Sequence, residues 1–219
     1  MIKVIVNGAK GRMGQEVVKA VSADKELELV AALDLGDDLG QKIKETKAQV
    51  VVDFTIPDTR MKNIEAIINN GAKAVVGTTG FTPDDLKTIE KWCADKKGAV
   101  LIAPNFAIGA VLLMQFAKEA IKYMPNAEII ELHHDKKLDA PSGTAIKTRE
   151  LMGNPNIPIH SVRLPGLVAH EEVIFGGLGQ TLTIRHDSIS RESFMPGVVM
   201  AVKKMIDKQG LIYGLEKII

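Results

Sequence analysis

The sequence predicts an α/β protein in which a doubly wound parallel sheet is followed by a second, α+β domain with a mixed sheet. Three observations lead to this prediction. Short apolar runs alternate with helical segments over residues 2–105, a glycine-rich turn follows the first run, and strands with little helix between them dominate the later part of the chain. A chain of 219 residues with 46% hydrophobic residues is long enough to bury two modest cores.

Alternating strands and helices in the first half indicate a parallel sheet covered on both faces. The expected strands are apolar runs without polar alternation, as burial on both faces requires. One helix start is marked by Asp58 and Thr59, and another by Pro83 with two acids in the first turn. We expect strands over residues 2–6, 27–33, 50–54, 74–76 and 100–103, and helices over residues 12–22, 59–70 and 83–96.

A change of pattern after residue 105 predicts the second domain. We expect a helix over residues 108–124, strands over 128–136, 159–163, 171–175 and 180–186, and helices over 145–152 and 196–206. The apolar segment 210–219 should pack back onto the first domain. These elements predict one domain from residues 1–104 plus 192–219 and another from residues 105–191.

Charge and cysteine content exclude several classes of protein. Lys plus Arg number 28 against 27 Asp plus Glu, and this near balance argues against nucleic acid as the main partner. No run of about 18 apolar residues predicts a membrane span, and Met1 leads directly into a strand without a signal peptide. The single cysteine, Cys93, cannot form an intramolecular disulfide and is expected to be an inert thiol. We therefore expect a soluble cytoplasmic protein.

A glycine-rich turn joins the first expected strand to the first expected helix. Its spacing, Gly8-x-x-Gly11-x-x-Gly14, is one residue longer at the front than the usual dinucleotide motif. Glycine allows backbone to approach a pyrophosphate, and Asp34 ends the second strand, where an acid binds ribose hydroxyls in Rossmann domains. The alternative is a tight turn without a ligand. Leu35 offers no charge to a 2′-phosphate, which favours NADH without excluding NADPH.

Two further strand ends carry small and amide residues that suit a nicotinamide and its ribose. They are residues 77–80, Gly-Thr-Thr-Gly, and residues 103–106, Ala-Pro-Asn-Phe. Ligands of open α/β sheets bind beyond the carboxyl ends of the strands, so both segments are candidates, although each could be a plain loop.

The most informative segment is residues 131–145, which places histidines and lysines just ahead of a helix start. His133 and His134 should face opposite sides of a strand, whereas Lys137 should share a face with His133. Ser142 or Thr144 can cap the helix, and the backbone N–H groups of residues 142–145 should be unpaired and able to bind a carboxylate or phosphate. The simpler alternative is a charged surface strand before an ordinary helix.

Metal binding is a second alternative for the same histidines. Helical zinc sites use His-x-x-x-His spacing and strand sites use i, i+2 spacing, and neither is present. We expect no metal.

With these segments in hand, the chain resembles the 4-hydroxy-tetrahydrodipicolinate (dihydrodipicolinate) reductases of lysine and diaminopimelate biosynthesis. The resemblance runs from end to end and includes residues 159–163 and 186–194. It implies a Rossmann domain that uses NADH or NADPH, a dicarboxylate substrate, and a second domain that binds substrate and assembles a homotetramer. Asp135 departs from the basic residues common at that position, and the chain is shorter than many members, which implies trimmed loops.

The resemblance also implies roles for individual residues. His133 and Lys137 would be catalytic, with Lys137 the proton donor, and the substrate would contact His134, Ser142, Gly143 and Thr144. The cofactor would contact Gly8, Ala9, Lys10, Gly11, Arg12, Met13, Asp34, Gly77, Thr78, Thr79, Ala103, Pro104, Asn105 and Phe106.

Two other functional classes share the first domain. An NAD-dependent amino-acid dehydrogenase acting on an aspartate-like substrate should lack the paired histidine and lysine arrangement. A non-catalytic dinucleotide-sensing protein would use its second domain for a partner, and nothing in the sequence resembles a helix-turn-helix.

Overall fold

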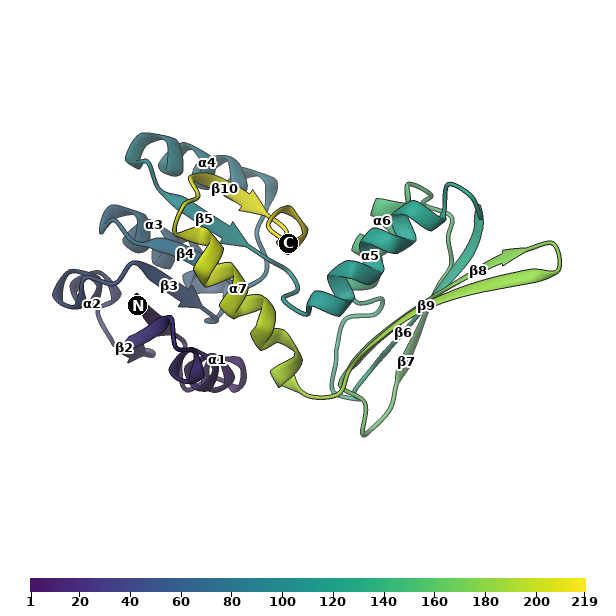
Figure 1. Ribbon diagram of the computed structural model, residues 1–219, viewed down its shortest axis with the longest axis horizontal. Coiled ribbons are helices and arrows are strands. Elements are labelled where there is room, and N and C mark those ends of the chain that lie inside the picture. The colour runs from purple at the N-terminus through teal and green to yellow at the C-terminus, as the bar shows by residue number, and fades with distance from the viewer. The chain divides into compact units, whose positions relative to one another are not determined.

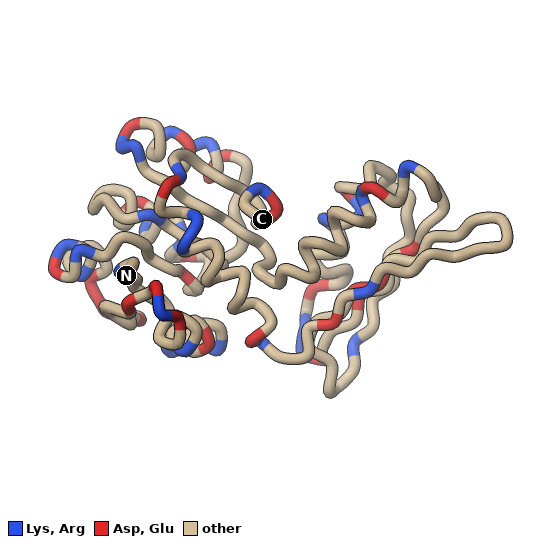
Figure 2. Tube along the Cα trace, in the orientation of Figure 1, with Lys and Arg blue, Asp and Glu red and all other residues tan.

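The computed structural model describes residues 1–219 and divides into two compact units, Met1–Phe106 with Phe194–Ile219 and Ala107–Ser193. These boundaries lie two residues beyond the expected ones. No helix is long and apolar enough to cross a membrane. Acidic and basic residues are interspersed in both units (Figure 2). The long hairpin of β8, Ala169–Gly177, and β9, Gln180–Ser188, carries no charge over residues 173–184 at its tip.

Unit 1 is built on a parallel six-stranded sheet of order β10-β5-β4-β3-β1-β2 (Figure 1). Its strands are β1 Ile2–Asn7, β2 Leu27–Leu33, β3 Val50–Asp53, β4 Lys73–Val76, β5 Ala99–Ile102 and β10 Gly210–Tyr213. Its helices are α1 Arg12–Ala23, α2 Leu39–Thr46, α3 Arg60–Asn69, α4 Pro83–Lys96 and α7 Met195–Met205, with 3-10 turns at Pro57–Thr59 and Leu215–Lys217. Parallel strands with intervening helices form the expected doubly wound Rossmann-type fold.

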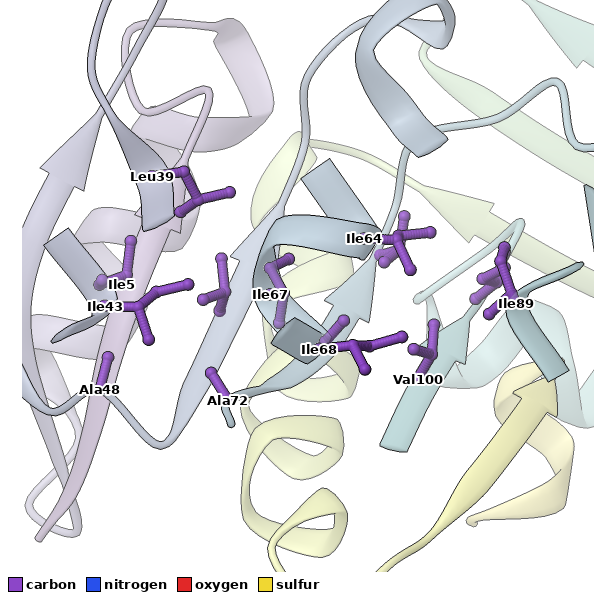
Figure 3. Close-up of a cluster of buried hydrophobic side chains, with 14 of the residues drawn as sticks. Ile5, Leu39, Ile43, Ala48, Ile64, Ile67, Ile68, Ala72, Ile89 and Val100 are labelled. Carbon is purple, nitrogen blue, oxygen red and sulfur yellow. The ribbon is translucent and has the colours of Figure 1, made fainter. Parts of the chain in front are cut away.

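Apolar side chains of α2, α3 and α4 pack against the central strands in one buried cluster (Figure 3). The cluster includes Leu39 and Ile43 of α2, Ile64, Ile67 and Ile68 of α3, Ile89 of α4, and Ile5 and Val100 of the sheet. Each fully buried aliphatic side chain of this kind contributes roughly 1.5–3 kcal/mol. This packing holds the carboxyl ends of β1, β3 and β4 in register.

Two elements of unit 1 were not predicted. Helix α2 is short and contains Gly40, but Asp38 caps it by accepting from the Gln41 N–H at 2.9 Å, and Leu39 and Ile43 bury its inner face. The segment 210–219 does return to unit 1, as expected, and its first four residues add the edge strand β10 beside β5.

Unit 2 is a four-stranded mixed sheet of order β7-β6-β8-β9, with α5 and α6 on one face (Figure 1). Strand β6 pairs parallel with β7 and antiparallel with β8. Its elements are α5 Ile108–Ala120, β6 Asn126–His133, α6 Gly143–Met152, β7 Ile159–Arg163, β8 Ala169–Gly177, β9 Gln180–Ser188 and a 3-10 turn at Arg191–Phe194.

Two expected boundaries in unit 2 were wrong. Helix α5 ends at Ala120 rather than at residue 124, because Pro125 disfavours helical backbone at Met124 and the chain leaves through tight turns. Strand β6 ends at His133 rather than at residue 136, because the Lys137 N–H closes a turn on the His134 carbonyl at 3.1 Å.

Candidate active site

A cavity of about 940 Å³ lies in unit 1 at the carboxyl ends of β1, β3 and β4. Gly8 turns there with φ +82°, and a Cβ at this position would lie 2.5 Å from the Phe54 carbonyl oxygen. A Cβ at Gly14 would lie 2.0 Å from the Gly8 oxygen. Both positions therefore require glycine, one for the turn and one for close packing of α1 on the strand end.

The start of α1 faces this cavity. Gly11 is the N-cap and has no side chain to cap the helix, so no group of the chain pairs with the first-turn N–H groups of Arg12 and Met13. Both residues line the cavity. Unpaired N–H groups at the positive end of a helix dipole fit the pyrophosphate of a dinucleotide.

Asp34 lies at the edge of the cavity, as an acid for the ribose hydroxyls should. Its carboxylate accepts from the N–H of Leu35 at 2.8 Å and of Lys10 at 2.7 Å, and these two bonds lower its pKa below the ordinary value. Asp37 and Asp38, which the sequence-based prediction did not include, also line the cavity. Asp37 accepts from the Asp34 N–H at 2.8 Å. This loop therefore presents three acids to the cavity.

A buried carboxylate, Asp53, organises the floor of the cavity and was also not predicted. It is 1% exposed and accepts from the side chains of Asn7 at 2.8 Å, Asn63 at 2.9 Å, and Thr55 and Thr78 at 2.8 Å each. No cation pairs with it, so hydrogen bonds from three strand ends and α3 balance its burial. The signal in the sequence is an Asp that ends a wholly apolar strand.

The expected cofactor residues divide into two groups. Those that line the cavity are Gly8, Gly11, Arg12, Met13, Asp34, Gly77, Thr78 and Thr79. Ala9, Lys10, Ala103, Pro104, Asn105 and Phe106 do not line it. Phe106 is buried against Phe54 with ring centroids 5.6 Å apart, and the Phe54 ring leaves no room for a Cβ at Gly77.

In unit 2 the buried Glu131 carboxylate joins the histidine segment to β7. Arg163 binds it in a bidentate manner, with Nη1 2.9 Å from Oε2 and Nη2 2.6 Å from Oε1, and also donates to the Asp139 carbonyl at 2.8 Å. Burial opposes ionisation of Glu131, but hydrogen bonds led by those of Arg163 outweigh it and lower its pKa. Sequence reasoning missed this pair, because its members are far apart in the chain.

Glu131 also fixes the ring of His133. The His133 Nδ1 atom lies 2.5 Å from Glu131 Oε2. Because a carboxylate can only accept, Nδ1 carries the hydrogen of this bond, and Nε2 is the ring nitrogen that gains or loses a proton. Burial lowers the pKa of His133, and the charge of Glu131 opposes this effect. His133 ends β6 and His134 lies beyond it, so the expected strand alternation does not apply to His134.

The Lys137 ammonium pairs with Asp139, at 2.7 and 2.8 Å from its two oxygens. Asp139, which was not predicted, is therefore the acid beside Lys137, while Asp135 is exposed. Lys137 leaves the strand direction, yet its charge acts on His133 by lowering the pKa of the ring. The two expected catalytic residues thus lie within electrostatic reach of each other.

Helix α6 begins beside this cluster, with Ser142 as its N-cap accepting from the Ala145 N–H at 3.2 Å. The expectation of unpaired N–H groups over residues 142–145 was partly wrong. The Ser142 N–H donates to Glu131 Oε1 at 3.2 Å, and the Ala145 N–H is used by the cap. The exposed Gly143 N–H remains available, and Thr144 follows it in the first turn.

No group of three or more His, Cys, Asp or Glu side chains is arranged to hold a metal ion. The buried Cys93 has its pKa raised to about 11 by burial, with a further contribution from the charge of Glu90. Its thiol is therefore a poor nucleophile at neutral pH.

Comparison with known proteins matches nearly the whole chain. Residues 2–106 match the family "Dihydrodipicolinate reductase, N-terminus" and residues 109–219 match "Dihydrodipicolinate reductase, C-terminus". The 4-hydroxy-tetrahydrodipicolinate reductase of Listeria innocua is 48% identical over 262 aligned positions, covering 100% of both chains, and that of Coxiella burnetii is 46% identical, covering 100% of this chain and 99% of the relative.

Solved structures agree with the sequence relatives. A dipicolinate-bound dihydrodipicolinate reductase from Paenisporosarcina sp. TG-14 superposes with a TM-score of 0.90 at 39% identity, covering 100% of both chains. An amine dehydrogenase from Mycobacterium smegmatis, with a TM-score of 0.73 at 9% identity, shares the fold alone. The chain belongs to the dihydrodipicolinate reductase family.

Proposed function

We propose that this chain reduces 4-hydroxy-tetrahydrodipicolinate to tetrahydrodipicolinate at the expense of NADH or NADPH, in the biosynthesis of diaminopimelate and lysine. The observation that carries the proposal is the end-to-end match, at 48% identity, to a reductase of that name. The chain is a nicotinamide-dependent oxidoreductase. Such an enzyme needs a cofactor site and a substrate site, and the chain has candidate residues for each.

The cavity of unit 1 fits the dinucleotide. The Gly8 turn lets backbone approach the pyrophosphate, the first-turn N–H groups of Arg12 and Met13 would donate to it, and Asp34 would accept from the ribose hydroxyls. On binding, the ribose hydroxyls would replace the Lys10 N–H as donors to the Asp34 carboxylate. When bound, the reduced nicotinamide supplies a hydride.

NADH should be the preferred cofactor. Asp34, Asp37 and Asp38 all border the cavity, and three acids repel a 2′-phosphate at short range. The glycine turn carries two cations that could offset them, Arg12, which lines the cavity, and Lys10, which does not. The ratio of kcat/KM for the two cofactors tests this preference, and a ratio of about ten or more in favour of NADPH would show that Arg12 or Lys10 overcomes the acids.

In unit 2, the histidines, Lys137 and the start of α6 suit a substrate with two carboxylates. The Lys137 ammonium, His133, His134 and the N–H groups at the start of α6, at Gly143 and Thr144, would together balance its charge, with Ser142 holding the helix start in place. A dipicolinate-bound relative of high similarity supports a planar dicarboxylate as ligand.

The reaction needs one proton at carbon. Loss of the substrate hydroxyl as water leaves a double bond conjugated to the ring imine. Addition of hydride at the far end of this system would leave an anion shared between the ring nitrogen and the carbon next to the site of addition, and one proton delivered to that carbon restores the ring imine. The Lys137 ammonium is the proposed donor, because it lies within electrostatic reach of His133 and is held in place by Asp139.

His133 would arrange or relay this proton. Its Nδ1 hydrogen is committed to Glu131, so the proton it exchanges is held at Nε2. Arg163 keeps Glu131 ionised and ties it to the Asp139 carbonyl, so one buried ion pair positions both His133 and the Lys137 segment.

The family resemblance extends the proposal to the setting of the enzyme. We assign unit 2 to substrate binding and to assembly of a homotetramer, and we place the enzyme in the cytoplasm with other biosynthetic enzymes. Sedimentation of the purified protein tests the assembly.

A direct assay tests the function. The condensation product of pyruvate and aspartate semialdehyde, made immediately before use, should cause oxidation of NADH that is followed by absorbance. The control reaction replaces that product with L-aspartate and NAD⁺, on which an amino-acid dehydrogenase would act. Turnover in the second reaction without turnover in the first would refute the proposal.

A further inference from the structure

Glu171 is a buried acid of unit 2 to which the proposed chemistry gives no role. It lies near the start of β8, directly opposite Glu131 of β6 on one side and His186 of β9 on the other. Its side chain is 4% exposed, and its one hydrogen-bonding partner is the Thr148 hydroxyl of α6. No cation pairs with it, in contrast to Glu131, which has Arg163.

The hydrogen count around Thr148 favours a protonated Glu171. Thr148 is fully buried, and its Oγ1 atom lies 3.1 Å from the Thr144 carbonyl oxygen and 2.5 Å from Glu171 Oε1. A hydroxyl has one hydrogen, and a carbonyl can only accept. Both contacts are hydrogen bonds only if Thr148 donates to Thr144 and Glu171 itself carries a hydrogen and donates to Thr148.

We propose that Glu171 is a positioning residue whose neutral carboxyl group donates to Thr148 and, through that hydroxyl, holds the Thr144 carbonyl and the first turn of α6 in the conformation that binds a substrate carboxylate. The inference rests on the proposed function in one respect, namely that the start of α6 is the carboxylate site. We call the chain of hydrogen bonds from Glu171 through Thr148 to Thr144 the relay. All of its contacts lie within unit 2.

The surroundings of Glu171 favour the neutral acid. Burial, the largest cause, and to a smaller degree the negative charge of Glu131 raise its pKa, whereas a hydrogen bond donated by Thr148 to the ionised carboxylate lowers it. The outcome is a pKa of about 7. His186 is the other ionisable group at this level of the sheet, and α5 covers its ring at Gly109. The charged residues Lys147 and Glu150 of α6 pair with each other near the surface.

Ionisation of Glu171 would therefore reorganise the relay. Above about pH 7 the carboxylate has no hydrogen to donate, and the Thr148 hydroxyl must turn toward it as the only donor available. The Thr144 carbonyl then loses the hydrogen bond from the Thr148 hydroxyl, and the first turn of α6 loosens where the substrate carboxylate would bind.

The test compares the wild type with Glu171→Gln, whose amide donates a hydrogen bond at every pH. The inhibition constant of pyridine-2,6-dicarboxylate is measured from about pH 6 to pH 8.5 for both proteins. The ratio of the two constants cancels every effect of pH that the two proteins share. We expect equal constants at about pH 6 and, at about pH 8.5, binding to the wild type that is weaker by about two- to tenfold, the usual effect of one lost hydrogen bond.

Two further variants complete the comparison. Glu150→Gln makes the same acid-to-amide change on the exposed side of α6 and should behave as the wild type at each pH. Thr148→Val removes the hydroxyl, so it should weaken inhibitor binding at every pH and abolish the pH-dependent difference. The KM of the dicarboxylate should follow the inhibition constant, while kcat changes less. A ratio between wild type and Glu171→Gln that is independent of pH overturns the proposal.

A second measurement separates this inference from the proposed function. Amide hydrogen exchange in the peptide spanning α6 is compared between the wild type and Glu171→Gln at equal pH and without ligand. Faster exchange in the wild type at about pH 8.5, but not at about pH 6, supports the relay even if pyridine-2,6-dicarboxylate binds neither protein, in which case the proposed function alone fails. Equal exchange at both pH values refutes the relay.

Discussion

Replacement of Glu171 by Gln should make the folded protein less sensitive to pH. Burial is the main cause that raises the pKa of this carboxyl group, from an ordinary value of 4.5 to about 7. The folded state therefore binds a proton more tightly than the unfolded state, and the stability this provides is present below about pH 4.5 and is lost as the pH rises through about 7. Glutamine is neutral throughout and has no such dependence.

The magnitude follows from the two pKa values. One pH unit of difference in pKa corresponds to about 1.4 kcal/mol, so the wild type should lose up to about 3 kcal/mol of unfolding free energy across this window. Because the carboxyl group is almost completely buried, solvent screening reduces this figure little. The difference between Glu171→Gln and wild type should therefore grow by up to about 3 kcal/mol between about pH 5 and pH 8.

Urea unfolding followed by far-UV circular dichroism measures this difference. Protein concentration is held constant, because assembly also contributes to apparent stability. The single tryptophan, Trp92, lies in α4 of unit 1 and reports on the unit that does not contain Glu171. Parallel dependence of stability on pH in the two proteins would refute a buried neutral acid at this position.

Three other substitutions test the site. Lys137→Ala should cut turnover by about two powers of ten or more and leave the Kd of the cofactor unchanged, because it removes the proton donor. The control Lys147→Ala, in the same unit, should have little effect. Equal loss of cofactor affinity and turnover would make Lys137 structural. Thr144→Val keeps the side-chain volume but removes the hydroxyl. Loss of one charge-assisted hydrogen bond, roughly 1.5–3 kcal/mol, should raise the KM of the dicarboxylate by about one to two powers of ten. An unchanged KM in a folded protein would place the carboxylate elsewhere. Burial lowers the pKa of His133 and the charge of Glu131 raises it, so Glu131→Gln should lower this pKa further, as NMR can measure. The value of kcat should drop roughly ten- to hundredfold. An unchanged His133 titration would contradict the role given to Glu131.

Local features of the chain determined the fold class. Each strand of the parallel sheet is a continuous apolar run, and several helix starts carry their own signals, such as the capping box formed by Thr82 and Asp85. The glycine turn was recognisable because Gly8, Gly11 and Gly14 lie within seven residues of each other, directly after an apolar run and at the start of a helical segment. Where such signals were weak, in α2 and β10, the sequence-based prediction missed the element.

Only tertiary structure determined how the candidate site is supported. The sequence pointed to His133, Lys137 and the start of α6, because these groups lie close together in the chain. Their partners come from elsewhere: Arg163 reaches Glu131 from β7, and Glu171 reaches Thr148 from β8, across separations of 32 and 23 residues. A charged residue in a sequence does not reveal whether it will be paired, neutral or solvated, because burial and partner geometry, which long-range strand pairing sets, decide its protonation state.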